Sequence, residues 1–153
     1  MERIWIYMSN RRLADVEVNQ ISNDLQGFMA AWNAHGNKLD ASFEILYNYF
    51  IIIKANEEKI MASGCSIDDS VRFMTGLAQK YNIDLFNRQQ VAWLDDKNEV
   101  KTATLNQLEE LYKTKTLTDN TIIFNNTLQN AEDLPLKWKQ PLTESPYKRL
   151  LGF

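Results

Sequence analysis

Two residue types that carry nucleophilic chemistry occur once each in this chain, as Cys65 and His35. Cys65 stands between Gly64 and Ser66, and Ser66 is followed three positions later by Asp69, the Ser-x-x-acid pattern of a helix N-terminus. This pattern predicts a helix that begins at about Ser66. Because the positive end of a helix favours a thiolate over a thiol, Cys65 is a candidate nucleophile or redox thiol.

His35 is the candidate base or ion-pair partner of this thiol, provided that the fold brings the two side chains together. Gly64 would let a substrate approach backbone amides, which would then serve as an oxyanion or anion site. Asp68 or Asp69 would orient the imidazole ring. Besides the catalytic pair, the residues predicted to bind a ligand are Trp32, Gly36, Ser63, Gly64, Ser66 and Asp68.

The same residues have a purely structural interpretation, which stays open at this point. Cysteine is among the most buried residue types, Ser66 is a helix cap, and Gly64 is a turn glycine. Asp68 and Asp69 would then be partners of the helix dipole in the first turn. Trp32, like the other tryptophans at apolar-periodic positions, would pack in the core.

Several chemistries are excluded by what the sequence lacks. Its five glycines begin no G-x-x-x-x-G-K-[ST] run and no G-x-G-x-x-G run, which excludes a P-loop and a Rossmann phosphate cradle. A single histidine excludes an HExxH zinc site, and a single cysteine excludes CxxC metal and dithiol motifs. A metal ion bound only by carboxylates stays open, but no EF-hand spacing occurs. We therefore expect no bound metal and no cofactor.

The elements that would position these residues follow from hydrophobic periodicity. In chain order we expect a strand at 3–8, a helix at 15–33, strands at 43–54 and 59–62, a helix from about Ser66, and a strand at 88–94. This is the β-α-β-β-α-β order of the ferredoxin-like arrangement, which belongs to the α+β class.

Beyond this core we expect a C-terminal extension with less regular structure. It would hold a helix at about 105–112, a strand at 121–125, and a tail that Pro135, Pro141 and Pro146 break into extended pieces. The 153 residues fit one domain, with its core at about 1–97 and the extension at about 98–153.

The expected topology decides which loops meet. The first and second strands would run the same way, so the loop after the first helix and the loop before the second helix would lie at one end of the sheet. His35 and Cys65 are therefore predicted neighbours, although they are 30 positions apart in the sequence. Arg11, Arg12 and Arg88 belong to the opposite end.

Three short segments carry a resemblance to a known group of proteins. They are Trp32-Asn33-Ala34-His35-Gly36, Ser63-Gly64-Cys65-Ser66-Ile67-Asp68 and Phe86-Asn87-Arg88. Over about residues 3–95 the chain resembles small bacterial proteins of unassigned function that are often labelled ABC transporter ATPases. The resemblance implies no established activity. The ATPase label is not supported by the sequence, because the P-loop is missing and the chain is short for a nucleotide-binding domain.

Composition and charge favour a cytoplasmic protein without a membrane-spanning segment and without a nucleic-acid partner. The longest apolar run near the middle is far shorter than the roughly 20 residues of a spanning helix, and the N-terminus lacks the pattern of a signal peptide. A lone cysteine agrees with a reducing compartment. The formal charge of −3 provides no basic field for nucleic acid.

Two functional classes therefore remain, and a third possibility concerns assembly. The first class is a non-enzymatic module that binds a small anionic ligand or a protein partner at the end loops holding His35 and residues 63–68. The alternative is a thiol enzyme or redox sensor in which Cys65 reacts and His35 assists. A homodimer formed through an open sheet face is the third possibility.

Overall fold

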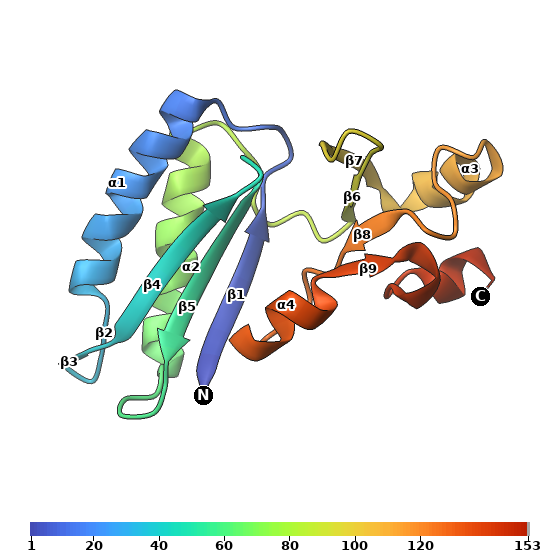
Figure 1. Cartoon of the computed structure of the whole chain (residues 1–153). Helices are drawn as coiled ribbons and strands as arrows, with labels where there is room; N and C mark the ends of the chain where they lie inside the picture. Colours follow the sequence, from blue (N-terminus) through green and yellow to red (C-terminus); the bar gives the residue numbers. More distant parts are fainter. Residues whose placement is uncertain (153) are drawn as a thin grey trace. The chain divides into compact units, whose positions relative to one another are not determined.

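The computed structural model describes residues 1–152, and it mixes helices with antiparallel sheets, as expected for the α+β class. The described residues divide into two units (Figure 1). Unit 1 comprises Met1–Phe86 together with Gln129–Ala131, and unit 2 comprises Asn87–Leu128 and the residues from Glu132 onward.

Unit 1 contains a three-stranded antiparallel sheet. Its central strand is β5 (Phe50–Asn56), with β1 (Glu2–Met8) on one side and β4 (Asp40–Leu46) on the other (Figure 1). The register places Ile53 opposite both Trp5 and Phe43. Because β1 and β4 both run antiparallel to β5, they run in the same direction, as the expected topology requires.

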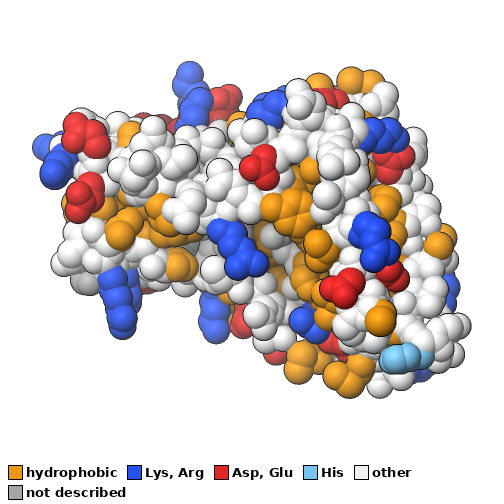
Figure 2. Space-filling view, turned by 180° about the vertical axis from the view of Figure 1, so that it is seen from behind, with side chains coloured by type: hydrophobic (Ala, Val, Ile, Leu, Met, Phe, Trp, Pro, Cys, Tyr) orange, Lys and Arg blue, Asp and Glu red, His pale blue; other side chains and the backbone are white. Residues whose placement is uncertain are grey.

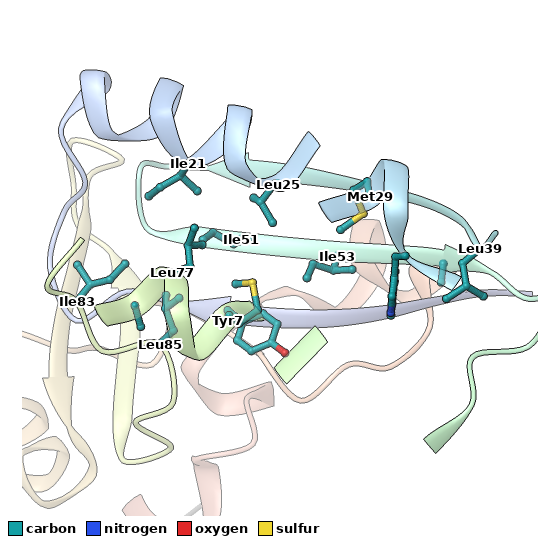
Figure 3. Close-up of a cluster of buried hydrophobic side chains, with 14 of the residues drawn as sticks. Tyr7, Ile21, Leu25, Met29, Leu39, Ile51, Ile53, Leu77, Ile83 and Leu85 are labelled. Carbon is teal, nitrogen blue, oxygen red and sulfur yellow. The ribbon is translucent and has the colours of Figure 1, made fainter. Parts of the chain in front are cut away.

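Two 17-residue helices, α1 (Asp15–Ala31) and α2 (Gly64–Lys80), pack on one face of this sheet. In α1 the apolar side chains of Ile21, Leu25 and Met29 recur every four residues, so they lie on one side of the helix. Figure 3 shows these three side chains directed toward the side chains of β5. The buried members of this core are Tyr7, Leu13, Ile21, Leu25, Met29, Trp32, Ala34, Leu39, Ile51, Ile53, Ala55, Met74, Leu77, Ala78, Ile83 and Leu85.

Unit 1 is completed by two short segments. A small hairpin formed by β2 (Asn33–Ala34) and β3 (Asn37–Lys38) connects α1 to β4. The segment Gln129–Ala131 lies along β1 at the edge of the sheet, where the backbone N–H of Ile4 donates to the carbonyl of Gln129 over 2.9 Å.

Unit 2 is built on a four-stranded antiparallel sheet with the order β7-β6-β8-β9. The strands are β6 (Gln90–Leu94), β7 (Val100–Thr104), β8 (Ile122–Phe124) and β9 (Lys139–Pro141). The helical segments are η1 (Leu105–Gln107), α3 (Leu108–Lys113), α4 (Leu134–Lys137), η3 (Leu142–Glu144) and η4 (Lys148–Leu151). The short segment η2 (Ala131–Asp133) begins at the last residue of unit 1 and continues into unit 2. Its buried cluster consists of Val91, Trp93, Leu108, Leu117, Ile123 and Leu142.

Several predicted elements are confirmed with shifted ends. The first strand, both long helices, the helix near 105–112 and the strand near 121–125 all form. The prediction of one strand at 43–54 followed by a return strand at 59–62 is wrong. The chain turns at Tyr47–Tyr49, so the predicted strand is itself the hairpin of β4 and β5, and residues 59–62 form no strand.

The predicted fourth strand at 88–94 forms, but in a different sheet. It is β6, which pairs with β7 and β8 in unit 2 and not with β1. The described structure therefore contains the β-α-β-β-α part of the expected arrangement without its fourth strand. It also divides the chain before residue 90, whereas we expected the core to extend to about residue 97.

Candidate functional site

The β2–β3 hairpin and the beginning of α2 meet at one end of unit 1, and we call the segments Asn33–Lys38 and Ser63–Asp68 the loop end. The indole N–H of Trp32, which precedes the hairpin, donates a buried 2.8 Å hydrogen bond to the backbone carbonyl of Ser66 in α2. The predicted meeting of these two segments is thereby confirmed.

Trp32 itself is a core residue. Its side chain is 2% exposed, and its ring packs edge-on against Trp5, with 5.8 Å between the ring centroids, and at 5.4 Å from Phe28. Phe28 in turn stacks on Phe73 of α2 at 4.5 Å. The ring of Trp32 thus links β1, α1 and α2 and is enclosed by protein, so in this structure it supports the loop end from within and offers no surface to a ligand.

His35 and Gly36 form the two-residue turn of the β2–β3 hairpin. Their φ angles of 53° and 79° both lie in the left-handed region, as a type I′ hairpin turn requires. Ala34 before the turn is buried, whereas His35 is exposed. Figure 2 accordingly shows the single histidine as a surface side chain. The hairpin therefore explains the residue types from Trp32 to Gly36 in structural terms. The imidazole of His35 is accessible to solvent at this turn.

The first turn of α2 begins earlier than the sequence pattern predicted. The N-cap is Ser63, whose Oγ accepts from the N–H of Ser66 over 3.1 Å, while Oγ of Ser66 accepts from the N–H of Ser63 over 2.7 Å. Ser66 is therefore the third helical residue and not the cap, and it is buried. Cys65 lies within the first turn and is exposed.

Asp68 and Asp69 do not lie where the structural interpretation placed them. Because α2 begins at Gly64, Asp68 and Asp69 fall in its second turn, and the first turn contains no acidic residue. Asp69 forms an exposed ion pair with Arg72 over 3.2 Å, and Asp68 is exposed. The prediction that these carboxylates compensate the helix dipole in the first turn is wrong.

His35 and Cys65 share the loop end without forming a catalytic pair in this structure. Within residues 1–152, neither side chain makes a hydrogen bond or an ion pair, to the other or to any third residue. The roles predicted for them as base and nucleophile stay predictions. Both side chains are accessible from solvent, which either role needs.

The start of α2 carries exposed backbone N–H groups. Within the described part of the chain, the backbone N–H groups of Gly64 and Cys65 have no hydrogen-bond acceptor, and both residues are exposed. In α1, by contrast, Asp15 and Glu17 place negative charge in the first turn. The first turn of α2 contains no acid, although the carboxylate of Glu57 accepts from the N–H of Ala62, two residues before the helix, over 2.8 Å.

The opposite end of unit 1 carries a hydrogen-bonded network that the sequence did not indicate. The Arg11 guanidinium donates to both carboxylate oxygens of Glu17, over 2.9 and 2.8 Å, and to the carbonyl of Tyr81 over 2.8 Å. Glu17 also accepts from the N–H of Ala14. These bonds, that from Arg11 above all, lower the pKa of Glu17 from 4.5 to about 2. Arg11 thereby connects the start of α1 to the end of α2.

A second network and a shallow groove lie on the outer side of the two helices. Asp24 of α1 accepts from Lys80 over 2.8 Å and from the Tyr81 hydroxyl over 2.7 Å, and both bonds lower the pKa of its carboxyl group. The groove has a volume of about 340 Å³ and is lined by Asp24, Arg72, Phe73, Gly76, Leu77 and Lys80. Its ion pair is already satisfied within the protein, so the groove offers little unpaired charge to a ligand.

Comparison of the chain with protein-family models, with curated proteins and with solved structures gave no match. Across residues 1–152, no three His, Cys, Asp or Glu side chains cluster in a way that would hold a metal ion. None of the described helices is both long enough and apolar enough to cross a bilayer. The fold and the loop end define a two-unit α+β protein with one accessible helix N-terminus as its candidate site.

Proposed function

We propose that this chain is a small binding module whose loop end receives an anionic group, carried either by a small ligand or by a protein partner. The observation that supports this function is the pair of unpaired backbone N–H groups of Gly64 and Cys65, at the start of a 17-residue helix without an acid in its first turn. Backbone N–H groups and the helix dipole act together on a bound anion.

The surroundings of these amides favour the same function. An added Cβ at Gly64 would meet no atom within 4 Å, so a ligand has room beside the backbone. The hydrogen bond from Trp32 to Ser66 holds the hairpin of His35 against this turn, which limits the loss of conformational entropy on binding. A protonated His35 would add a positive charge at the same end of unit 1.

The proposal can be tested by removing one amide hydrogen without disturbing the helix. Gly64 is the first helical residue, where proline is well tolerated, and Ser63 before it has the extended conformation (φ −89°, ψ 167°) that a residue preceding proline prefers. Gly64→Pro therefore deletes one N–H group in a folded protein. Gly64→Ala is the matched control, because it adds a Cβ in open space and keeps the N–H group.

The assay is a titration with inorganic phosphate, and with acetate as a carboxylate probe, followed by amide chemical shifts at constant ionic strength. We expect the shifts to centre on residues 64–66, Gly64→Ala to bind like the wild type, and Gly64→Pro to bind about tenfold more weakly, since one charge-assisted hydrogen bond is lost. Equal affinity of the two variants, or no shift in this turn, refutes the proposal.

Thiol chemistry at Cys65 is the second candidate function, and the exposure of Cys65 in the first turn of α2 favours it. Its test is the rate of alkylation of the folded protein by iodoacetamide as a function of pH. A reactive thiol is labelled well below the reference thiol pKa of about 8.5, and His35→Asn, which suits the left-handed turn, shifts that pH profile if His35 assists. A profile centred near the reference value excludes this candidate.

A further inference from the structure

Strand β4 has a free edge. It pairs with β5 along one side, and within residues 1–152 no strand and no backbone hydrogen bond occupies its other side. The opposite edge of the same sheet is different, because the segment Gln129–Ala131 lies along β1 there. Figure 1 shows β4 as the outer strand of the sheet in unit 1.

This edge carries few of the devices that usually prevent pairing with another chain. The seven residues of β4 include no proline, glycine or lysine, and their register with β5 runs from Asp40 to Leu46 without a bulge. Strands of this kind are templates for a further strand unless something blocks them. The only charged residues of β4 are Asp40 and Glu44.

The side chains of β4 alternate between two different faces. Ala41, Phe43 and Ile45 are partly buried against the core beneath the helices, whereas the exposed Asp40, Ser42 and Glu44 point to the other face. On that second face, Glu44 forms a 3.1 Å ion pair with Lys54 of β5, and Lys54 stands directly opposite Ser42 in the register.

We propose that β4 pairs antiparallel with β4 of a second copy of the chain, with Phe43 on the two-fold axis, so that two three-stranded sheets join into one. In this register Ala41 faces Ile45 of the second copy, and the two Phe43 side chains face each other. The apolar rows beneath the helices then continue across the dimer, which adds aromatic and aliphatic cross-strand pairs.

Charge complementarity on the other face selects the same register. On that face Ser42 stands opposite Glu44 of the second copy. A row of side chains across the joined sheet then runs from Lys54 of β5 to Ser42 of β4 and on to Glu44 of the second copy. Lys54, which pairs with Glu44 of its own copy over 3.1 Å, stands beside Ser42 and would then be shared with the second copy's Glu44, and the symmetric row repeats the arrangement. Both acidic residues of the edge avoid a like charge directly opposite.

The neighbouring two-fold registers that keep the helices on one face of the joined sheet are disfavoured. Centring the pair on Ser42 places Asp40 opposite Glu44 of the second copy, and centring it on Glu44 places this carboxylate opposite itself. Like charges directly opposite each other destabilise a strand pair. The two acids thus disfavour both adjacent registers, and registers centred on Ala41 or Ile45 would pair only the ends of the two β4 strands.

The decisive variant is Ser42→Glu. Within one copy the new carboxylate stands opposite Lys54, which already pairs with Glu44, so the melting temperature is measured to check that the folded chain is retained. In the dimer it stands opposite Glu44 of the second copy, and two such like-charge pairs form. The double variant Ser42→Glu with Glu44→Lys restores opposite charges at both places. Gln79→Glu, on the exposed side of α2, is the control for the same change in charge.

The assay is sedimentation velocity of the full chain over a concentration series from about 5 to about 500 µM, with melting temperature as the check on folding. We expect the wild type and the Gln79→Glu control to dimerise alike, Ser42→Glu to raise the dimer Kd by about tenfold, and the double variant to return toward the wild-type Kd. Amide hydrogen exchange in β4 should slow as the dimer forms. A monomeric wild type, or a dimer insensitive to Ser42→Glu, overturns the proposal.

Discussion

Replacing Trp32 by phenylalanine tests whether this side chain ties the hairpin of the loop end to α2. The variant keeps an aromatic ring between Trp5 and Phe28 but removes the indole N–H group that donates to the Ser66 carbonyl. The structure therefore predicts two separate losses, one of a buried hydrogen bond and one of buried apolar surface.

The expected destabilisation follows from these two contributions. A buried hydrogen bond contributes about 1 kcal/mol to stability. A phenyl ring buries about 50 Å² less than indole, which at about 25 cal/mol per Å² adds about 1 kcal/mol. Trp32 is 2% exposed, so the full loss of surface applies. We expect Trp32→Phe to lower the free energy of unfolding by about 2 kcal/mol.

The assay is urea-induced unfolding followed by far-ultraviolet circular dichroism, with Trp5→Phe as the matched control. Trp5 belongs to the same aromatic cluster, but its indole N–H has no hydrogen-bond partner within residues 1–152. Its replacement should therefore cost about 1 kcal/mol or less, from lost apolar surface and a weaker cation–π contact with the Arg3 guanidinium, which lies 4.8 Å from the ring centroid. Amide exchange in the β2–β3 hairpin should accelerate only in Trp32→Phe. Equal destabilisation by the two variants would refute the assigned hydrogen bond.

Two further predictions concern stability away from the loop end. The pKa of Glu17 is about 2 in the folded protein and 4.5 when unperturbed. Its ionised carboxylate therefore stabilises the folded state above pH 4.5, and this stabilisation is lost as the pH falls from 4.5 toward 2. Glu17→Gln should lower the free energy of unfolding at pH 7 by about 1 kcal/mol, a value already reduced because Arg11 is partly exposed to solvent. Urea unfolding at pH 7 and at pH 3 should show that the variant and the wild type differ less in acid. Gly27→Ala and Gly76→Ala each fill open space within a helix and should raise the free energy of unfolding by about 1 kcal/mol; unchanged urea midpoints would contradict this.

The two long helices were predictable from sequence because the spacing of their apolar residues shows which side of each helix is buried. Residues such as Ile21, Leu25 and Met29 must lie on one side of a helix to reach the sheet, and that requirement is visible in a single segment. The meeting of the two loops at one end was predictable as well, since it depends only on the directions of β1, β4 and β5.

The β4–β5 hairpin was missed because its turn carries no glycine or proline. Tyr47 and Asn48 both adopt a φ of 57° within a run of apolar and aromatic residues. The turn is held from outside this segment, since the Asn48 side chain donates to the Leu13 carbonyl and to Asp15. Asn48 is the one local signal, because asparagine tolerates the left-handed region better than most residues.

The position of the strand at 88–94 could not be read from its own residues. Its apolar residues would suit any sheet that is buried on both faces. The strand joins the sheet of unit 2 because it pairs with β7, which follows it after a turn at Asp95. The Asp95 carboxylate accepts from the N–H groups of Lys97 and Glu99, and Asn98 adopts a positive φ. These contacts form a local hairpin between β6 and β7, whereas pairing with β1 would have required a distant partner.

At the candidate site, residue types were a better guide than exact positions. The Ser63–Ser66 pair does mark the start of α2, but the choice between two serines as cap depended on backbone geometry. The structural interpretation placed Trp32 correctly in the core, but sequence reasoning missed its hydrogen bond, because nothing in the spacing from Trp32 to Ser66 indicates a bond between an indole and a helix carbonyl.

The segment Gln129–Ala131 has a consequence for how the protein can be made. On the ribosome, β1 is synthesised long before the residues that lie along its edge, and the strands β6, β7 and β8 are made in between. A fragment that ends at Phe86 would leave that edge of β1 open to other chains. The first sheet is thus finished late in translation, and deletions near residue 130 should impair the solubility of a segment more than a hundred positions upstream.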